Sequence, residues 1–245
     1  MGITINGGHF NGNSVIINGL IVGGGNFFDG DSKSIDEKKS TSANGISRIT
    51  VNSNCVNVQM NVADTNTIDA HLFGHVTTDG TTEFDISTFG TEVKITVNLT
   101  GISINSNLRL YIDIPATMFD TIDVTSKNGD IIISEGVSVR KLNLKSANGN
   151  VKSNATFEVI TANSKNGNTK VSVNAISDVE LDVSSKNGNA IVELHNISCC
   201  NLSTSSMNGS VHNCFHATTG HNTANGEVSS KNGDVKLSWI QIKHD

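Results

Sequence analysis

The side chains most suited to metal chemistry are those of His212, Cys214 and His216. Imidazole nitrogen and cysteine sulfur are good zinc ligands. If this segment is a β-strand, a spacing of two places all three on one face. Neighbouring members are then about 6.6 Å apart, which is too far for one ion to bind easily. Val211 and Phe215 take the positions that fit a buried face, so the three candidates are expected to point outward. We therefore expect no metal and no other cofactor, and the three remain the candidate metal cluster.

Carboxylates that could cleave a polysaccharide are scattered along the chain. Enzymes built on parallel β-helices need convergent acidic or basic groups for acid–base chemistry. Glu180 and Asp182 share a strand face, but it is the outward face, opposite Leu181 and Val183. No Ser-His-Asp order, glycine-rich phosphate loop or CxxC motif is present. The sequence therefore predicts a protein without catalytic residues, and a polysaccharide-acting β-helix enzyme is kept as an alternative.

Four lysines occupy one position of a repeated phrase, where they could bind an anionic partner. They are Lys127, Lys165, Lys186 and Lys231. If the repeats stack, these side chains line up as a basic ridge, which is the candidate binding surface. The alternative is a solvated corner, where lysine discourages unwanted pairing at a sheet edge.

The repeated phrase itself is Ser-x-Asn-Gly, which occurs six times between residues 126 and 233. Its asparagines are 20, 18, 21, 21 and 24 residues apart, by subtraction of their positions. A period of this size indicates stacked supersecondary units, because one unit cannot bury its apolar face alone. The predicted structural turn residues are Asn128, Gly129, Asn148, Gly149, Asn166, Gly167, Asn187, Gly188, Asn208, Gly209, Asn232 and Gly233.

Apolar and polar residues alternate on both sides of these turns. Leu181 and Val183 precede one turn, for example, and Ala190 and Val192 follow it. This alternation is typical of strands with one buried face. Each Asn-Gly is expected to take the positive φ angles of a tight turn. The serine of each phrase is expected to hydrogen-bond the turn backbone or the stacked neighbour.

A further apolar position between repeats suggests a third short inward side of each coil. Its members are Val137, Phe157, Ile176 and Ile197. We therefore predict an all-β fold, a single-stranded β-solenoid (β-helix) with coils of roughly 20 residues, preceded by an irregular β region.

Composition restricts the partners that the chain can have. A net charge of −6 and a pI near 5.7 disfavour nucleic acid, whose binders carry a basic face. No stretch is apolar over the ~18 residues that a membrane-spanning segment needs, and residues 1–25 do not resemble a secretory signal. Location stays open: cytoplasmic if Met1 is the native start, or the cell surface if an export signal was removed.

Patterning divides the chain into four parts. The pattern predicts short strands over residues 1–22, with an outlying coil as the alternative, and a linker over the charged residues 23–46. Residues 47–120 alternate without the phrase and form an irregular β region or early coils. Residues 121–245 form the solenoid repeats with a C-terminal cap.

The junction between the last two parts resembles that of the bacterial "putative adhesin" domains of unknown function. It reads Leu108-Arg-Leu-Tyr-Ile-Asp-Ile-Pro115, then Phe119, then Ile122 to Asp130, and the earlier Ile49 to Val58 is similar to the family's first strands. The resemblance covers about residues 47–239. It implies an irregular β region that leads into Asn/Gly-cornered coils, with a binding or scaffolding role and no enzymatic one. A cell-surface protein or a glycan is the partner it suggests, and self-assembly of the solenoid is the alternative.

Overall fold

The computed structural model describes residues 32–101, 106–214 and 222–239 with their side chains, and the backbone of the strands within residues 3–22 and of residues 31 and 103–105. All regular elements of these residues are strands, so the predicted all-β class is confirmed. None of the described residues forms a helix long and apolar enough to cross a membrane. Four short strands pair antiparallel in a sheet of their own: β1 (Ile3–Ile5), β2 (Gly8–Asn11), β3 (Ser14–Ile17) and β4 (Leu20–Val22).

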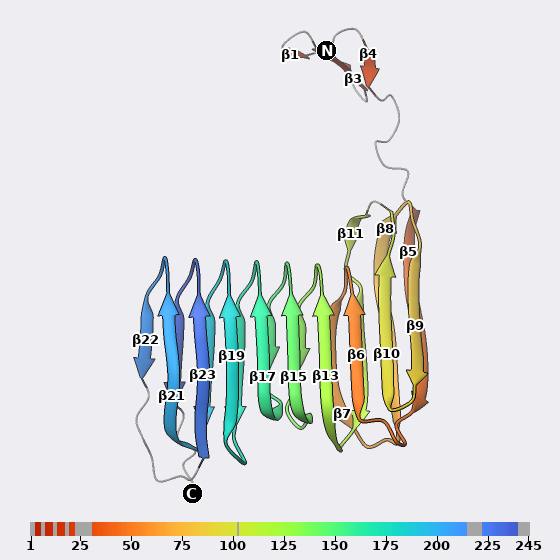
Figure 1. Ribbon diagram of the computed structural model, residues 1–245. Helices are drawn as coiled ribbons and strands as arrows, with labels where there is room; N and C mark the ends of the chain where they lie inside the picture. Colours follow the sequence, from red (N-terminus) through yellow and green to blue (C-terminus); the bar gives the residue numbers. More distant parts are fainter. Residues whose placement is uncertain are drawn as a thin grey trace, which may run out of the picture.

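Two long sheets make up the body of the molecule, and the first, sheet I, faces the viewer in Figure 1. Its order is β21-β23-β19-β17-β15-β13-β6-β10-β9. The bounds are β6 (Arg48–Ser53), β9 (Thr82–Phe89), β10 (Glu92–Leu99), β13 (Met118–Ser126), β15 (Ser138–Ser146), β17 (Thr156–Ser164), β19 (Val179–Ser185), β21 (Ile197–Ser206) and β23 (Asn222–Ser230).

Sheet II lies behind sheet I in the order β11-β8-β12-β7-β14-β16-β18-β20-β24-β22, with β5 also paired to β8. The bounds are β5 (Asp31–Ser42), β7 (Asn57–Ala63), β8 (Thr67–Thr78), β11 (Ser103–Ser106), β12 (Arg109–Pro115), β14 (Ile131–Ile133), β16 (Val151–Ser153), β18 (Thr169–Asn174), β20 (Ala190–His195), β22 (Val211–Cys214) and β24 (Val235–Trp239). Each repeat contributes one strand to each sheet, so one coil of the solenoid is a strand of sheet I, an Asn-Gly corner and a strand of sheet II.

The core lies between the two sheets and is built from ladders of equivalent side chains. Val124, Leu144, Ala162, Val183 and Val228 occupy one register position of successive strands in sheet I. Each is at most 1% exposed. Parallel in-register pairing of the coils confirms the predicted β-solenoid. Stacking is what buries these residues, since a lone coil would leave its inner face in water.

The coil has two strand-bearing sides. Of the four residues predicted to form a third short inward side, Val137, Phe157 and Ile197 are buried and Ile176 is not. Val137 is buried at the corner between the two sheets, but Ile176 is 71% exposed and Ala175 points inward in its place. Phe157 belongs to β17, where it pairs with Val139. A corner that is only a few residues long has room for one inward side chain. That buried position is filled by a small alanine in one coil and by a larger residue in another.

Residues 47–120 join the stack at its N-terminal end. β6 and β7 pair parallel with β13 and β14, so they form an additional coil without the Ser-x-Asn-Gly phrase. Antiparallel pairs, β9 with β10 and β8 with β12, then close that end of the two sheets.

The predicted linker over residues 23–46 is wrong for residues 31–42, which form β5. β5 pairs antiparallel with β8 along its whole length, from Asp31 opposite Thr78 to Ser42 opposite Thr67. Its charged sequence shows no apolar alternation because it is an edge strand, held by backbone hydrogen bonds and largely exposed. Lys39 also reaches β9, where its Nζ donates to the carbonyl oxygen of Phe84 at 2.6 Å and lies 3.9 Å from Asp85 Oδ1.

The last two coils are stacked out of sequence order. β23 lies between β19 and β21, and β24 lies between β20 and β22. The inserted coil brings Val228, Val235 and Leu237, each 0% exposed, whereas Val211 of the outer coil is 43% exposed. The more apolar coil thus takes the position with neighbours on both sides, and the more polar coil takes the end.

The coil order can be tested by disulfide trapping in a variant whose native cysteines are replaced by serine. Ser184 faces Ser229, and Ser229 faces Ser205. We expect a disulfide between cysteines at 184 and 229 but none between 184 and 205. Facing Cα atoms of adjacent strands are about 5 Å apart, within disulfide reach, and those two strands apart are about 10 Å apart. Peptide mass spectrometry would show the links, and the opposite pattern would mean that the coils stack in chain order.

Candidate functional site

The Asn-Gly corners form three ladders of hydrogen bonds along one rim of the solenoid. In the first, each asparagine side chain donates from Nδ2 to the asparagine Oδ1 of the next coil. These bonds join Asn208, Asn232, Asn187, Asn166, Asn148 and Asn128 in that order, each at 2.7 Å. The ladder ends at the carbonyl oxygen of Asn54, 3.1 Å from Asn128 Nδ2. Every amide therefore has a partner across the coil boundary.

The serines of the phrase form the second ladder, as expected. Ser185 Oγ donates to the carbonyl oxygen of Gly167 at 2.7 Å, and Ser230 Oγ donates to that of Gly188 at 2.8 Å. The residue after each glycine forms the third ladder, in which a backbone N–H donates to the side-chain oxygen of the neighbouring coil, as from Asp234 to Asn189 at 2.8 Å. Together the ladders fix the register of each coil on the next.

The corner glycines serve a different purpose from the one predicted. Among the described residues, the glycines with positive φ are Gly45, Gly74, Gly90, Gly101, Gly136 and Gly226, and none of these is a turn glycine of the phrase. A Cβ on Gly188 would instead lie 2.4 Å from the carbonyl oxygen of Gly167, and one on Gly129 would lie 2.0 Å from that of Val56. Close approach of the next backbone, not positive φ, therefore requires glycine here.

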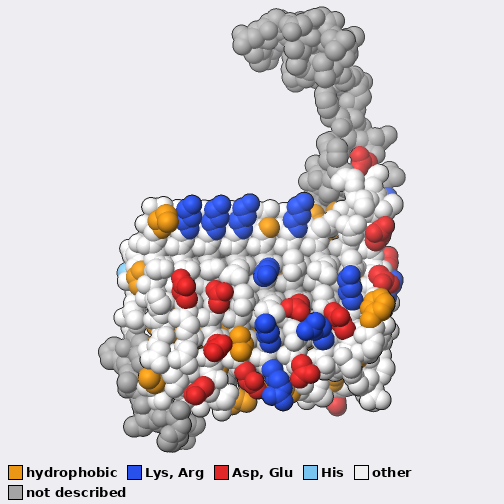
Figure 2. Space-filling model, in the orientation of Figure 1, with side chains coloured by type: hydrophobic (Ala, Val, Ile, Leu, Met, Phe, Trp, Pro, Cys, Tyr) orange, Lys and Arg blue, Asp and Glu red, His pale blue; other side chains and the backbone are white. Residues whose placement is uncertain are grey.

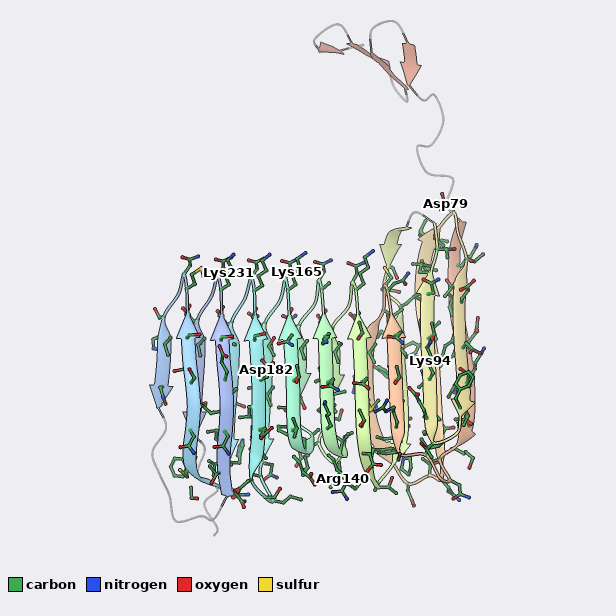
Figure 3. The ribbon with its side chains drawn as sticks, viewed as in Figure 1. Asp79, Lys94, Arg140, Lys165, Asp182 and Lys231 are labelled. Atoms are coloured by element: carbon green, nitrogen blue, oxygen red, sulfur yellow. The ribbon has the colours of Figure 1, made fainter. Side chains whose placement is uncertain are left out.

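The four predicted ridge lysines lie on these corners and are exposed. Lys165, Lys186 and Lys231 occupy three consecutive coils, because the N–H of Lys186 bonds to Ser164 and the N–H of Lys231 bonds to Ser185. Lys127 is separated from them by the coil that carries Ala147. Figure 2 shows these lysines along one rim, and Figure 3 places Lys165 and Lys231 at the turns that follow β17 and β23. We call Lys165, Lys186 and Lys231 the lysine row.

The out-of-order coil makes the lysine row continuous. Lys186 and Lys231 are 45 residues apart in the chain, yet their corners are adjacent. With stacking in chain order, Met207 would stand between them. Neighbouring lysines are about one strand spacing, roughly 4.8 Å, apart at their backbones. Within the described part of the chain none of the three forms an ion pair.

An open groove of about 800 Å³ runs beside the lysine row on the outer face of sheet I. Its floor is the cross-strand row that directly precedes the phrase serines. This row consists of Lys145, Asn163, Ser184, Ser229 and Ser205. Hydroxyl and amide groups thus lie beside a line of positive charge. These residues were not predicted from the sequence, although they occupy a fixed position one residue before each phrase.

The candidate metal cluster does not form a site within the residues that the structure describes. His212 and Cys214 are exposed on β22, and His216 lies outside the described residues. No group of three His, Cys, Asp or Glu side chains in the described ranges could hold a metal ion.

The carboxylates considered for catalysis do not converge. Glu180 and Asp182 lie on the exposed outer face of sheet I, where Figure 3 labels Asp182. Glu193 lies on sheet II, 2.7 Å from Lys170 Nζ. Partial burial acts to raise the pKa of the Glu193 carboxyl, but hydrogen bonds from Lys170 and Ser172 outweigh it and lower the pKa. This carboxylate is therefore an ion-pair partner and not a group held ready to donate a proton.

Comparison with known proteins identifies the family. A family model described as Toastrack DUF4097 matches residues 46–244. The chain belongs to the Toastrack DUF4097 family. No curated protein matches it. The match confirms the resemblance found in the sequence.

Solved structures resemble this chain at low sequence identity. A "putative cell adhesion protein" from Clostridium sporogenes has 13% identity and a TM-score of 0.52, over 85% of this chain and 100% of that one. A "putative adhesin" from Bacteroides fragilis has 11% identity and a TM-score of 0.37, over 84% of this chain and 97% of that one. One from Parabacteroides merdae has 10% identity and a TM-score of 0.36, over 88% and 98%. At such identities the first of these shows a common fold and nothing about a ligand.

Replacing Gly188 by alanine tests why the corner needs glycine. At an unstrained position without positive φ, this change generally stabilises a protein by about 0.4–1 kcal/mol, because it restricts the unfolded chain. Here the new Cβ would lie 2.4 Å from the carbonyl oxygen of Gly167, so we expect a loss of about 1–3 kcal/mol in the free energy of unfolding. Urea denaturation would measure it, with Lys186→Ala as the control at an exposed position of the same corner. Equal or higher stability of Gly188→Ala would refute close approach as the constraint.

Proposed function

We propose that this Toastrack domain is a non-enzymatic binding module that attaches to a linear acidic polysaccharide along the lysine row. The observation that carries the proposal is the alignment of three exposed lysines, without ion-pair partners in the described structure, on consecutive coils. A molecule with a net charge of −6 gathers these positive charges on one rim. The regular spacing favours a partner whose own charges repeat.

The groove beside the row supports a sugar polymer over other anions. Its serine and asparagine side chains offer donors and acceptors to sugar hydroxyls, while the row pairs with carboxylates. An exposed charge pair contributes about 0.2–1 kcal/mol. Useful affinity therefore requires several sugar residues to bind at once, and it should weaken as salt increases.

The arrangement of carboxylates favours binding over cleavage. Among the described residues, the acidic side chains beside the groove form no pair that could serve as acid and base, and Glu227 is the one that lines it. The description of the Clostridium sporogenes neighbour as a "putative cell adhesion protein" agrees with an attachment role. The proposal itself depends on the lysine row.

Charge reversal of the row tests the proposal. We expect the triple variant Lys165→Glu, Lys186→Glu, Lys231→Glu to bind polygalacturonate about three- to 150-fold more weakly than the native domain, since it loses three charge contacts. The matched control is Lys94→Glu, Lys152→Glu, Lys236→Glu, which changes the net charge equally at exposed sites off the row. Isothermal titration at low and high salt would measure both. Equal losses in the two variants would contradict the assignment of the row.

A gain of affinity is the complementary test. Ala147→Lys would join Lys127 to the lysine row and give a continuous line of lysines across five corners, counted as 127, 147, 165, 186 and 231. We expect polygalacturonate to bind up to about fivefold more tightly for each added contact of 1 kcal/mol. Lys141→Ala, an exposed change away from the corner, serves as a control for stability. Unchanged affinity in Ala147→Lys would mean that the polymer does not follow the row.

A further inference from the structure

A second surface with features of a ligand site lies on the outer face of sheet II, where β12 and β14 flank β7. Side chains of these strands form a small grid. Arg109 and Asn57 follow one cross-strand row, and Tyr111, Gln59 and Ile132 follow the next. Asp130, just before β14, adjoins the first row, because its backbone N–H donates to Asn57 Oδ1 at 2.9 Å. They line a groove of about 230 Å³. Since small-molecule pockets generally enclose about 300–1,000 Å³, this groove admits one ring and not an extended chain.

Tyr111 forms one wall of the groove, and its ring is packed against side chains of β8 on the side away from β7. The ring of Phe73 meets that of Tyr111 edge to face, with centroids 5.0 Å apart. His71 stacks at a tilt on Phe73, with centroids 4.8 Å apart, and its Nε2 lies 2.7 Å from Asp36 Oδ1. This chain of contacts crosses β12, β8 and β5. It leaves the side of Tyr111 that faces β7 as a preorganised apolar surface.

The polar groups of the groove have hydrogen-bonding and ion-pairing capacity that the described chain does not use. Arg109 is exposed and forms no ion pair or side-chain hydrogen bond with the described residues. Asp130 accepts from the backbone N–H of Asn150 through Oδ1, at 2.7 Å. Its other carboxylate oxygen has no bond within the described chain. Gln59 donates to Asn61 Oδ1 at 3.0 Å, which leaves its own carbonyl oxygen as an acceptor.

We propose that this groove binds a single carboxylated sugar ring, a uronate. The apolar C–H face of the ring packs on Tyr111 opposite Ile132, which stands two strand spacings, roughly 9.6 Å, away. The ring hydroxyls donate to Asp130 and Gln59. The sugar carboxylate pairs with the Arg109 guanidinium, whose planar fork suits two-point contact with a carboxylate. A flat aromatic acid would pair with Arg109 equally well but would leave the acceptors at the other side unused.

This site is separate from the lysine row and does not depend on it. Asp130 lies on the sheet II side of its corner, whereas the groove of the lysine row lies on sheet I. A monosaccharide cannot span the row, because the row needs several charges in line. Failure of either proposal therefore leaves the other standing.

The chain's single tyrosine provides a built-in reporter. In protein with ring-labelled tyrosine, NMR shows one tyrosine side chain, and it is Tyr111. We expect its resonances to shift in a saturable way with D-glucuronate, and about tenfold more glucose to be needed for the same shift, since glucose lacks the carboxylate. Benzoate, the flat aromatic acid, is expected to be the weaker competitor.

Substitutions at Arg109 complete the test. In Arg109→Gln, an exposed change that should leave the melting temperature unaltered, glucuronate and glucose should bind with equal affinity. The lysine-row triple variant is the control, and its Tyr111 resonances should respond as in the native domain. The proposal is overturned by absence of a saturable shift with glucuronate, by benzoate binding more tightly than glucuronate, or by discrimination that survives in Arg109→Gln.

Discussion

The distance between neighbouring coils at the Asn-Gly corner constrains the rest of the solenoid. The carbonyl oxygen of one corner glycine occupies the space where the Cβ of the next would be. The backbones can therefore approach to the strand spacing while the chain reverses direction. Once they do, the asparagine amides reach each other at 2.7 Å and the serine hydroxyls reach the glycine carbonyls. The same spacing places the apolar residues of both sheets in contact and buries them.

The corner also determines what the solenoid shows to solvent. Serine, asparagine and glycine use their hydrogen-bonding groups within the stack, so the remaining position of the phrase is the one free to vary. It holds lysine on four coils, Ala147 on another and Met207 on the end coil. The hydrogen-bonded ladders and the exposed corner side chains thus come from different residues of one short phrase. Under the proposed function, substitutions at the variable position change the partner without loss of the ladders.

Much of the fold could be predicted from the sequence because the period is short and each coil repeats the same burial pattern. Register followed from aligning the phrases, which places Val124 over Leu144.

The conformation of the glycines could not be predicted, since Asn-Gly is compatible with a positive-φ turn and with close packing. β5 was missed because an edge strand needs no apolar face. The order of the last two coils depends on which of them buries more apolar surface in the inner position. The alternation of residues within one strand does not show this. For the same reason the positions of the lysine row could be predicted but not their contiguity. The groove around Tyr111 depends on β12 lying beside β7, across about 50 residues of chain, as in the pairing of Tyr111 with Gln59.

The inserted coil has a consequence for biosynthesis. When a ribosome delivers the chain from its N-terminus, β21 and β22 emerge before β23 and β24, the strands they must pair with. Until then the open edge of β19 and β20 offers the wrong partner, and any early attachment there has to be undone. Such non-local steps slow folding and prolong the exposure of unpaired, aggregation-prone sheet edges. Coil order therefore delays the maturation of a nascent molecule as well as determining which coil is buried in the finished one.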